Sequence, residues 1–405
     1  MQEEFDVLIV GGGMVGAAVA CALGDSSLSV ALVEQTMPEA FSSDQPHDMR
    51  VSALSIASKK ILETVGAWDA VISMRSCPFK RMRVWETAGD TEFNSDTIDY
   101  EALGYIVENR VTQLALLQRA QTFSNVTLLC PAVIKQIAYE QGKGCVTLDD
   151  GRVLTAKVMV GADGGQSRVR QTVGLGVTSW DYQQQAMVIN VETDYEQQDI
   201  TWQSFTTHGP LAFLPLPDID GKHYASLVWY DFPTQLERLL AQDNDTLLAT
   251  LQTSYPADLP PLESVIAKAK FPLFKSHAKH YVMEGLALAG DAAHTINPLA
   301  GQGVNLGFMD AAVLIETIAQ AVLNDEDFSS LAVLRRYEKK RRSENQSMMS
   351  LMDAFYYGFS SKHLPARVAR NLGLGVAQRL GFAKNKVMQY AIGVSGDLPR
   401  LAKPI

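Results

Sequence analysis

Residues 290–307 read GDAAHTINPLAGQGVNLG, a sequence that predicts a strand end, a turn, a loop and the start of a helix. The apolar run Leu286 to Ala289 directly before it is typical of a buried strand, which Gly290-Asp291 would end. Pro298 restricts the residue before it and directs the chain away from helical geometry. Gly301-Gln302-Gly303 then opens a helix.

The same residues offer a place for a ligand. Glycines at a helix start let backbone N–H groups approach a ligand closely, and the positive end of the helix dipole favours an anion or an electron-rich carbonyl. Asp291 is predicted to face the ligand crevice at the carboxyl end of its strand. A tight turn followed by a helix cap would give the same pattern, so this stretch alone leaves both interpretations open.

The N-terminus contains a glycine fingerprint in its full structural context. A predicted strand, Phe5 to Val10, leads into Gly11-x-Gly13-x-x-Gly16 and a helix through Leu23. A second strand, Val30 to Val33, ends at the acidic residue Glu34. In this motif the three glycines serve a tight turn, the approach of a pyrophosphate and close helix packing, while the acid binds a ribose hydroxyl. The pattern predicts a dinucleotide site and does not separate NAD from FAD.

A second acidic turn lies in the middle of the chain. A predicted hairpin, Cys145 to Leu148 with Val153 to Thr155, is followed by the short buried strand Val158 to Val160. That strand runs into GADGGQSRVR, which begins at Gly161 and places Asp163 at the carboxyl end. A glycine-rich turn capped by aspartate explains this turn by itself. Two such turns and the N-terminal fingerprint in one chain favour a shared ligand site.

Residues 180–270 differ in pattern from the rest. Four β-runs without intervening helices predict an antiparallel sheet inserted into the first domain: Ala186 to Val191, Trp202 to Thr206, Leu211 to Pro215 and Tyr224 to Trp229. Leu236 to Tyr255 is predicted to be helical. The predicted FAD-binding parts are 1–78, 101–179 and 271–330, the substrate-domain parts are 79–100 and 180–270, and the basic helical C-terminal region is 331–405.

Composition and charge limit the class of protein. The 405 residues are 47% hydrophobic and 20% charged, which indicates a globular chain with a large core. The four cysteines have no CxxC spacing, so we expect reduced thiols, a cytoplasmic protein and no metal site. Acidic residues precede the apolar segment Val7 to Leu23, which argues against a signal peptide, and no other segment is expected to reach a membrane-spanning length.

The charge is unevenly distributed. Of the formal net charge of −10, residues 331–405 contribute +10, so the remainder carries −20. An acidic body makes nucleic acid a poor partner. From Ala354 to Gly396 the sequence has no acidic residue, and its basic residues alternate with apolar ones. Such a tail suits an anionic membrane surface or a partner protein, and packing of the tail on the acidic body is the alternative.

Taken together, the three motifs resemble the signatures of the single-component FAD aromatic hydroxylases, in that family's order and across nearly the whole chain. The chain is more closely similar to the ubiquinone-biosynthesis branch, through Val107-Glu108-Asn109, Trp180-Asp181-Tyr182 and residues 294–307. Among the ring hydroxylations of that branch, four further stretches are most similar to the demethoxyubiquinol hydroxylases: Gly66 to Val71, Trp202 to Phe205, Ser226 to Asp231 and Phe355 to Ser360.

The resemblance implies a fold, a chemistry and a set of site residues. It implies a Rossmann-like FAD domain with an inserted antiparallel sheet and C-terminal helices, and hydroxylation of a polyprenyl quinol through a flavin hydroperoxide, using O₂ and electrons from NAD(P)H. Family members often begin the helix near 109 with a flavin-contacting arginine, for which Arg110 is the candidate here because Asn109 takes the aligned position. His294 and Pro298 are candidates that line the site. The implied cofactor contacts are Gly11, Gly13, Met14, Val15, Gly16, Glu34, Gln35, Arg50, Arg110, Val133, Asp163, Asp291, Pro298, Gly301, Gln302, Gly303, Val304 and Asn305.

Other functions share parts of this pattern. A flavin dehydrogenase or prenyl reductase would have the same N-terminal fingerprint without inserting oxygen into its substrate. A flavin-stabilised structural subunit of a biosynthetic assembly would bind the cofactor without turning over. Other ubiquinone-biosynthesis proteins are candidate partners. The sequence does not indicate the length of the isoprenoid tail, the choice of NADH or NADPH, or the oligomeric state.

Overall fold

A largely parallel sheet forms the centre of the N-terminal fold. The computed structural model describes residues 2–86, 90–206, 209–255, 259–296, 302–360 and 381–403. The sheet order is β17-β18-β11-β1-β2-β8, and β9 and β10 extend it from β11. Its strands are β1 (Gln2–Val10), β2 (Val30–Val33), β8 (Val126–Leu129), β9 (Ile134–Glu140), β10 (Lys143–Leu148), β11 (Val153–Gly161), β17 (Val282–Met283) and β18 (Leu286–Leu288).

One strand of this sheet replaces two predicted ones. β11 pairs antiparallel with β10 through residues 153–156 and runs parallel to β1 from Val153 to Gly161. The hairpin predicted around Asp149-Asp150-Gly151 is confirmed, but the strand predicted at Val158 to Val160 is the same strand continued. The two segments looked separate in the sequence because Lys157 interrupts them. They form one strand, in which β11 passes from the half-buried margin of the sheet into its buried centre.

Six helices pack around this sheet: α1 (Met14–Ala22), α2 (Ile56–Thr64), α3 (Trp68–Met74), α4 (Asn109–Ala120), α5 (Arg168–Thr172) and α8 (Gln302–Leu323). α8 corrects one sequence expectation, since its length and composition would allow it to cross a membrane. However, 61% of its apolar window is buried inside the protein, where α8 packs on α1. A core helix meets the same criteria, and burial explains the apolar composition.

A small antiparallel sheet lies beside the first one, in the order β3-β7-β4, with β3 (Val51–Ser55), β4 (Cys77–Phe79) and β7 (Gly104–Glu108). Ser55 ends β3 and caps α2, because its hydroxyl accepts a hydrogen bond from the Ser58 amide. β3 directly follows Arg50, so pairing of this strand in the small sheet fixes the backbone position of Arg50.

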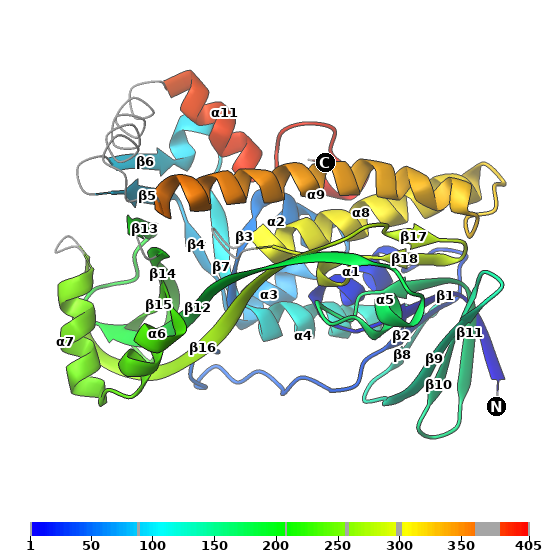
Figure 1. Cartoon of the computed structure of the whole chain (residues 1–405), viewed down its shortest axis with the longest axis horizontal. Coiled ribbons are helices and arrows are strands. Elements are labelled where there is room, and N and C mark those ends of the chain that lie inside the picture. Colours follow the sequence, from blue (N-terminus) through cyan, green and yellow to red (C-terminus); the bar gives the residue numbers. More distant parts are fainter. Residues whose placement is uncertain are drawn as a thin grey trace.

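The second large sheet has the order β19-β16-β12-β15-β14-β13-β5-β6. Its strands are β5 (Arg81–Trp85), β6 (Asp90–Asn94), β12 (Val177–Thr193), β13 (Ile200–Thr206), β14 (Gly209–Ile219), β15 (Lys222–Asp231), β16 (Leu262–Ala278) and β19 (His294–Thr295). All pairs are antiparallel except β13 with β5. In Figure 1, β12 and β16 run as two long neighbouring strands across the molecule. The α/β fold class with an inserted antiparallel sheet is confirmed, and the domain boundaries stay a prediction.

Two short helices cover one face of this sheet. The segment predicted to be helical, Leu236 to Tyr255, forms two helices: α6 (Pro233–Leu240) ends and α7 (Asn244–Ser254) begins anew. Asp243 makes the break, because its side chain accepts a hydrogen bond from the Thr246 amide and caps α7. Leu236, Leu247 and Leu251 are fully buried against the sheet. The opposite face of the sheet is turned toward the glycine-rich turns at Gly13, Gly164 and Asp291.

The C-terminal region is helical, as predicted, and lies along the top of the molecule in Figure 1. It consists of α9 (Leu331–Ser360), α11 (Gly381–Ala391) and the short η4 (Arg400–Ala402). Met388 and Ile392 are buried in a cluster with Cys77 and Phe79. α11 therefore packs on the body through these residues, in agreement with the packing alternative for that part of the tail. Residues 361–380 of the predicted amphipathic tail lie outside the described residues.

Candidate active site

A cavity of about 490 Å³ lies where the glycine turns meet the uncovered face of the second sheet. One end is bordered by Arg50 and by residues of the three predicted motifs: Gly13, Met14, Val15, Ala162, Gly164, Asp291, Gly303 and Val304. The other end is bordered by side chains from β12 to β16. Cavities of this size between two parts of a fold are typical of small-molecule sites. The three sequence motifs are thus brought together at one place.

Each of the three fingerprint glycines is required, or fits, for a different structural reason. Gly11 has φ +102°, and a Cβ there would lie 2.5 Å from the carbonyl oxygen of Ala162. A Cβ on Gly16 would lie 1.9 Å from the carbonyl oxygen of Gly11, so only glycine lets helix and turn pack this closely. Gly13 is different, since nothing lies within 4 Å of its Cβ position. The space beside Gly13 is open toward the cavity and fits the approach of a pyrophosphate.

Two polar side chains hold the glycine turn. The amide of Gly12 donates to Glu34 Oε2 over 2.7 Å, and Gln113 Nε2 donates to the Gly12 carbonyl over 2.9 Å. Glu34 thus lies at the turn, where a ribose is expected. Gln113 was missed by sequence reasoning because one glutamine on a helix carries no distinctive signal.

Gln35 and Val133 lie at the same sheet edge as Glu34. Gln35 is exposed directly after β2, and Val133 is 42% exposed. The amide of Ala132, next to Val133, donates to the Glu34 carbonyl over 2.8 Å. Neither residue borders the cavity. Their cofactor contact stays a prediction for the outer part of the site.

Asp163 binds the first turn of α5, whose N-cap is Ser167, and retains one unused oxygen. Its Oδ2 accepts a hydrogen bond from the Val169 amide over 3.1 Å. Its Oδ1 is buried and has no hydrogen-bond partner among the described residues. A buried carboxylate oxygen without a donor is costly, so this atom fits a donor from a bound cofactor.

Arg170 connects the two acidic turns, and sequence reasoning did not find it. Its Nη1 donates to the Ala292 carbonyl over 2.7 Å, and its Nη2 donates to the Gly165 carbonyl over 2.8 Å. The side chain is buried, and burial lowers the pKa of its guanidinium while Asp163 opposes that shift. One rigid guanidinium therefore fixes the spacing of the turns that carry Asp163 and Asp291.

Asp291 lies where the sequence placed it. Its side chain is exposed to the cavity, while the protein surrounds it on its other sides. Burial raises the pKa of Asp291, although the charges of His294 and Arg50 act in the opposite direction. Arg50 borders the same cavity, with its guanidinium 5.8 Å from the ring centre of Phe271. This acid and base face the space where a ribityl chain and a phosphate would lie.

Arg110 does not border the cavity, and its flavin contact stays a prediction. Its Nε donates to Asp48 Oδ2 over 2.9 Å, and its Nη1 donates to the Glu39 carbonyl over 3.0 Å. The side chain holds the loop that leads to Arg50.

His294 does not line the cavity either. It is 1% exposed, and its Nε2 lies 2.5 Å from Asp310 Oδ2 on α8. The same Asp310 carboxylate accepts from the Gly290 amide, from Arg341 Nε and from Asn345 Nδ2, over 3.0, 2.7 and 3.0 Å. His294 is therefore part of a buried polar network that supports the Asp291 turn from behind. Pro298 and Gly301 lie outside the described residues.

The start of α8 reaches the cavity through Gly303 and Val304. Gln302 is directed elsewhere, since its Nε2 donates to the Ala391 carbonyl over 3.4 Å. The side chain of Asn305 is buried, and its Oδ1 accepts from the Ser55 amide over 2.9 Å. Asn305 therefore ties α8 to the small sheet, and a cofactor contact at this position would come from its backbone.

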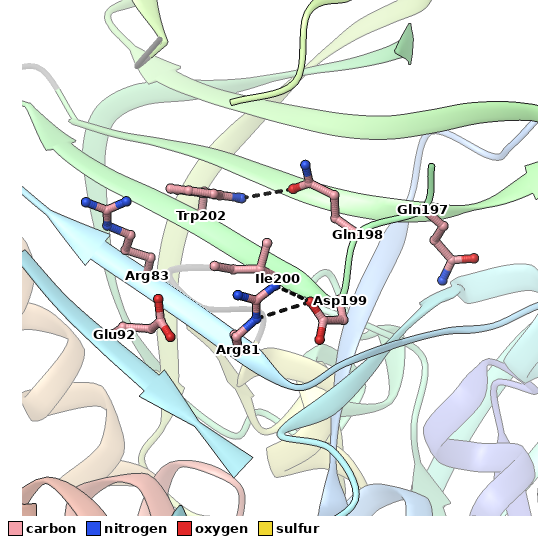
Figure 2. A pocket seen from close by; sticks show the side chains of 8 residues that line it. All are labelled: Arg81, Arg83, Glu92, Gln197, Gln198, Asp199, Ile200 and Trp202. Carbon is pink, nitrogen blue, oxygen red and sulfur yellow. Dashed lines mark hydrogen bonds and ion pairs between the residues drawn. The ribbon is translucent and has the colours of Figure 1, made fainter. Parts of the chain in front are cut away.

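A second cavity, of about 450 Å³, lies on the other face of the large sheet. Figure 2 shows Arg81 paired with Asp199, and the Trp202 indole directed at Gln198. By strand register, Arg81 and Arg83 share a face with Ile200 and Trp202, the face that α6 and α7 cover elsewhere. None of the predicted cofactor residues borders this cavity. Its charged lining forms ion pairs, and it is separate from the candidate active site.

Residues 4–351 match the family described as FAD binding domain. The chain is 42% identical to the 3-demethoxyubiquinol 3-hydroxylase of Escherichia coli K12, with 97% of this chain and all of that protein covered. It is 34% identical to the ubiquinone hydroxylase UbiL of Rhodospirillum rubrum, over 99% of this chain and 93% of that one.

A solved structure shows the same fold at lower identity. The p-nitrophenol 4-monooxygenase PnpA of Pseudomonas putida DLL-E4 superimposes with a TM-score of 0.78 at 18% identity. The superposition covers 98% of this chain and the whole of that one. The family match, the relatives and the glycine geometry agree on the cofactor, which is FAD. The chain belongs to the FAD binding domain family, in the branch of flavin-dependent monooxygenases to which these relatives belong.

Proposed function

We propose that this protein hydroxylates the aromatic ring of a polyprenyl quinol in ubiquinone biosynthesis, at the demethoxyubiquinol step. The observation that carries the proposal is the full-length identity of 42% to a 3-demethoxyubiquinol 3-hydroxylase. The cavity supports it, because its substrate end is built mainly of apolar side chains that suit a ring with hydrocarbon substituents. NAD(P)H is the proposed electron donor.

The residues at the cofactor end would bind and orient FAD. The open space at Gly13 would admit the pyrophosphate, and Asp163 and Asp291 would accept hydrogen bonds from hydroxyl groups of the cofactor. Arg50 would pair with a phosphate or contact the ribityl region. The first amides of α8, at Gly303 and Val304, border the cavity and place the positive end of a 22-residue helix there. That partial charge would stabilise negative charge on a reduced flavin ring.

The proposed reaction needs no side-chain nucleophile. When bound and reduced, FAD supplies the chemistry, which is activation of O₂ and delivery of one oxygen atom to the substrate. The protein orients the ring and excludes water. Val188, Ala212, Leu214 and Val228 line the substrate end and serve both purposes, since apolar walls leave water few hydrogen-bond partners.

Isotope labelling tests the proposed function. The purified FAD-loaded protein would be given NADH or NADPH, ¹⁸O₂ and a short-tailed demethoxyubiquinol, and the product analysed by mass spectrometry. One ¹⁸O atom in the new hydroxyl group is expected. A reduced or oxidised product without label would identify a dehydrogenase or prenyl reductase instead. Stoichiometric FAD without any turnover would favour a structural subunit.

Deletion of the protein should cause the demethoxy precursor to accumulate.

We further propose peripheral contact with an anionic membrane surface, because a polyprenyl quinol resides in the bilayer. The described part of the tail supports this through α11, on which Val387 and Tyr390 are 57% and 45% exposed while Met388 faces the body. Flotation with anionic vesicles at low salt tests it. The double variant Val387→Glu/Tyr390→Glu should float less than the unchanged protein. Equal flotation of the two would refute contact through α11.

A further inference from the structure

The uncovered face of the large sheet has a defined set of side chains at the cavity. Residues paired directly across neighbouring strands project to the same face of a sheet. Ser226 on β15 pairs with Leu214 on β14 and with Asn190 on β12. On β13, Thr201 pairs with Met82 of β5. Ser226, Leu214, Thr201 and Met82 all border the cavity, so one row of this face forms the end wall of the substrate region.

Two hydroxyl groups in that wall lack hydrogen-bond partners. Ser226 is 0% exposed and Thr201 is 4% exposed, yet Ser226 Oγ and Thr201 Oγ1 make no hydrogen bond to any described residue. A buried hydroxyl without a partner destabilises the folded protein, and its retention needs an explanation. The hydroxyl proton rotates freely, so each group can donate to or accept from a molecule in the cavity.

The charge of the same wall restricts what that molecule can be. Among the described residues that border the cavity, Arg50 and Asp291 are the charged ones. These two interact electrostatically with each other at the cofactor end. Around Ser226 and Thr201 the lining is uncharged: Ala212, Leu214 and Val228 are apolar, and Gln203 is a neutral amide. A carboxylate placed there would lose its hydration without gaining a cationic partner. A neutral ring with oxygen substituents meets no such cost.

We propose that Ser226 and Thr201 bind the ring oxygens of a neutral aromatic substrate, in a wall whose lack of cationic side chains disfavours aryl carboxylates. The two residues determine specificity and take no part in the oxygen transfer. The inference rests on the proposed function for the identity of that ring as a methoxylated quinol. Beyond that function, it names the groups that bind the hydroxyl or methoxy oxygens, and it explains why an uncharged substrate is favoured.

Anaerobic binding titrations on the FAD-loaded protein test this, with the flavin absorbance as signal. The probes are 2-methoxy-5-methyl-1,4-benzoquinol, its analogue with ethyl in place of methoxy, and 4-hydroxybenzoate. Ser226→Ala and Thr201→Val should each weaken binding of the methoxyquinol by roughly two- to tenfold, the range for one hydrogen bond. The variant whose partner is the methoxy oxygen should bind the ethyl analogue as the unchanged protein does. The benzoate should bind at least tenfold more weakly than the quinol.

Control variants separate recognition from folding. Thr201→Ser retains the hydroxyl and should restore binding. Ser204→Ala removes a hydroxyl from the opposite face, since Ser204 pairs with Leu211 of the buried cluster, and should change nothing. In turnover, Ser226→Ala should raise KM more than it lowers kcat. Unchanged quinol binding in both variants, or benzoate binding as tight as quinol binding, would overturn the inference. Quinol binding as described without any hydroxylated product would instead overturn the proposed function.

Discussion

The carboxylate of Asp310 on α8 and the amide of Gly290 are joined by a 3.0 Å hydrogen bond, although the two residues lie on different elements. This bond fixes the turn that presents Asp291 to the cavity. The same carboxylate binds His294 and the buried Arg341. Burial acts to raise the pKa of Asp310, but His294 and Arg341 outweigh it and hold the pKa well below its usual range. The turn is therefore supported by a carboxylate that stays ionised.

Replacing Asp310 should damage both stability and cofactor binding. Asp310→Asn leaves the Arg341 guanidinium buried without its charge partner, which should lower the free energy of unfolding by about 3–5 kcal/mol. FAD affinity should fall as well, because the Gly290 amide loses an ionised acceptor. Thermal unfolding and flavin titration measure the two effects. Glu344→Gln is the matched control, since Glu344 pairs with the same arginine at an exposed position and should cost at most about 1 kcal/mol. Equal stability of both variants would contradict the network.

Two glycine variants should separate folding from FAD binding. Gly13→Val should abolish FAD binding and leave the fold intact, because its side chain enters open space where the pyrophosphate is expected. Gly16→Ala should destabilise the protein itself, because its Cβ would lie 1.9 Å from the Gly11 carbonyl oxygen. Circular dichroism and bound flavin per chain distinguish the outcomes. A folded Gly13→Val protein with full FAD would show that the fingerprint does not bind the cofactor.

Asp291 should contribute to FAD affinity without contributing to the fold. Asp291→Ala should weaken FAD binding by about 1.5–3 kcal/mol for each charge-assisted hydrogen bond lost. Asp291→Asn, which still accepts hydrogen bonds, should weaken it less. Isothermal titration of the flavin-free protein with FAD provides the measurement. Stoichiometric, tight FAD binding by Asp291→Ala at dilute concentration would remove this residue from the site.

Stability should fall as the pH drops from about 6.5 to about 4. Burial lowers the pKa of His47 and of His277 to about 4, so both stay neutral in the folded protein over this range. The unfolded chain takes up these protons near pH 6.5, so acid favours unfolding, and each histidine accounts for up to about 3 kcal/mol. Denaturant unfolding across this range measures the slope. His277→Phe should reduce the slope, and removal of the exposed His280 should not. A slope that His277→Phe leaves unchanged would contradict the assignment.

A chain that ends at Met352 should not fold stably. It would lose Met388, Ile392 and Ala402, which are buried against the body, and the bond from the Ala57 amide to the Ile392 carbonyl. Loss of each large buried side chain costs about 2–5 kcal/mol. Circular dichroism and flavin content check this expectation. A shortened chain that is folded and binds FAD would show that the packing of α11 is dispensable. Flotation of that shortened chain with anionic vesicles would then test whether the tail contacts the membrane.

The parts predicted correctly from the sequence are those fixed by local chemistry. The turn at Gly11 to Gly16 and the turn at Asp291 each lie within one short stretch, and their backbone needs restrict the residue type. Arg170 and Asp310 were not found because their partners lie on other elements and an isolated charge carries no local signal. The ion pair of Arg110 with Asp48 was not expected either, because the loop that holds Asp48 has no regular pattern.

The long strand β16 was missed for a related reason. Its central residues Lys268 to Lys275 mix basic and apolar side chains and include Pro272, which argues against a strand in a sequence. In the structure one end of β16 packs in the core under α6 and α7 and the other end, at Ala278, in the core of the parallel sheet, so no single alternation of apolar and polar residues describes the strand. Pairing with β12, which only the assembled sheet supplies, decides its conformation.

β16 also has a thermodynamic consequence. Its residues Phe271 to Phe274 border the substrate region, and four residues later the Ala278 amide donates to the Ala293 carbonyl in the turn that carries Asp291. One continuous backbone thus forms a wall of the substrate region and a support of the cofactor turn. Any coupling of the substrate region and the cofactor turn through this backbone acts in both directions. Linkage makes the factor by which substrate tightens FAD identical to the factor by which FAD tightens substrate.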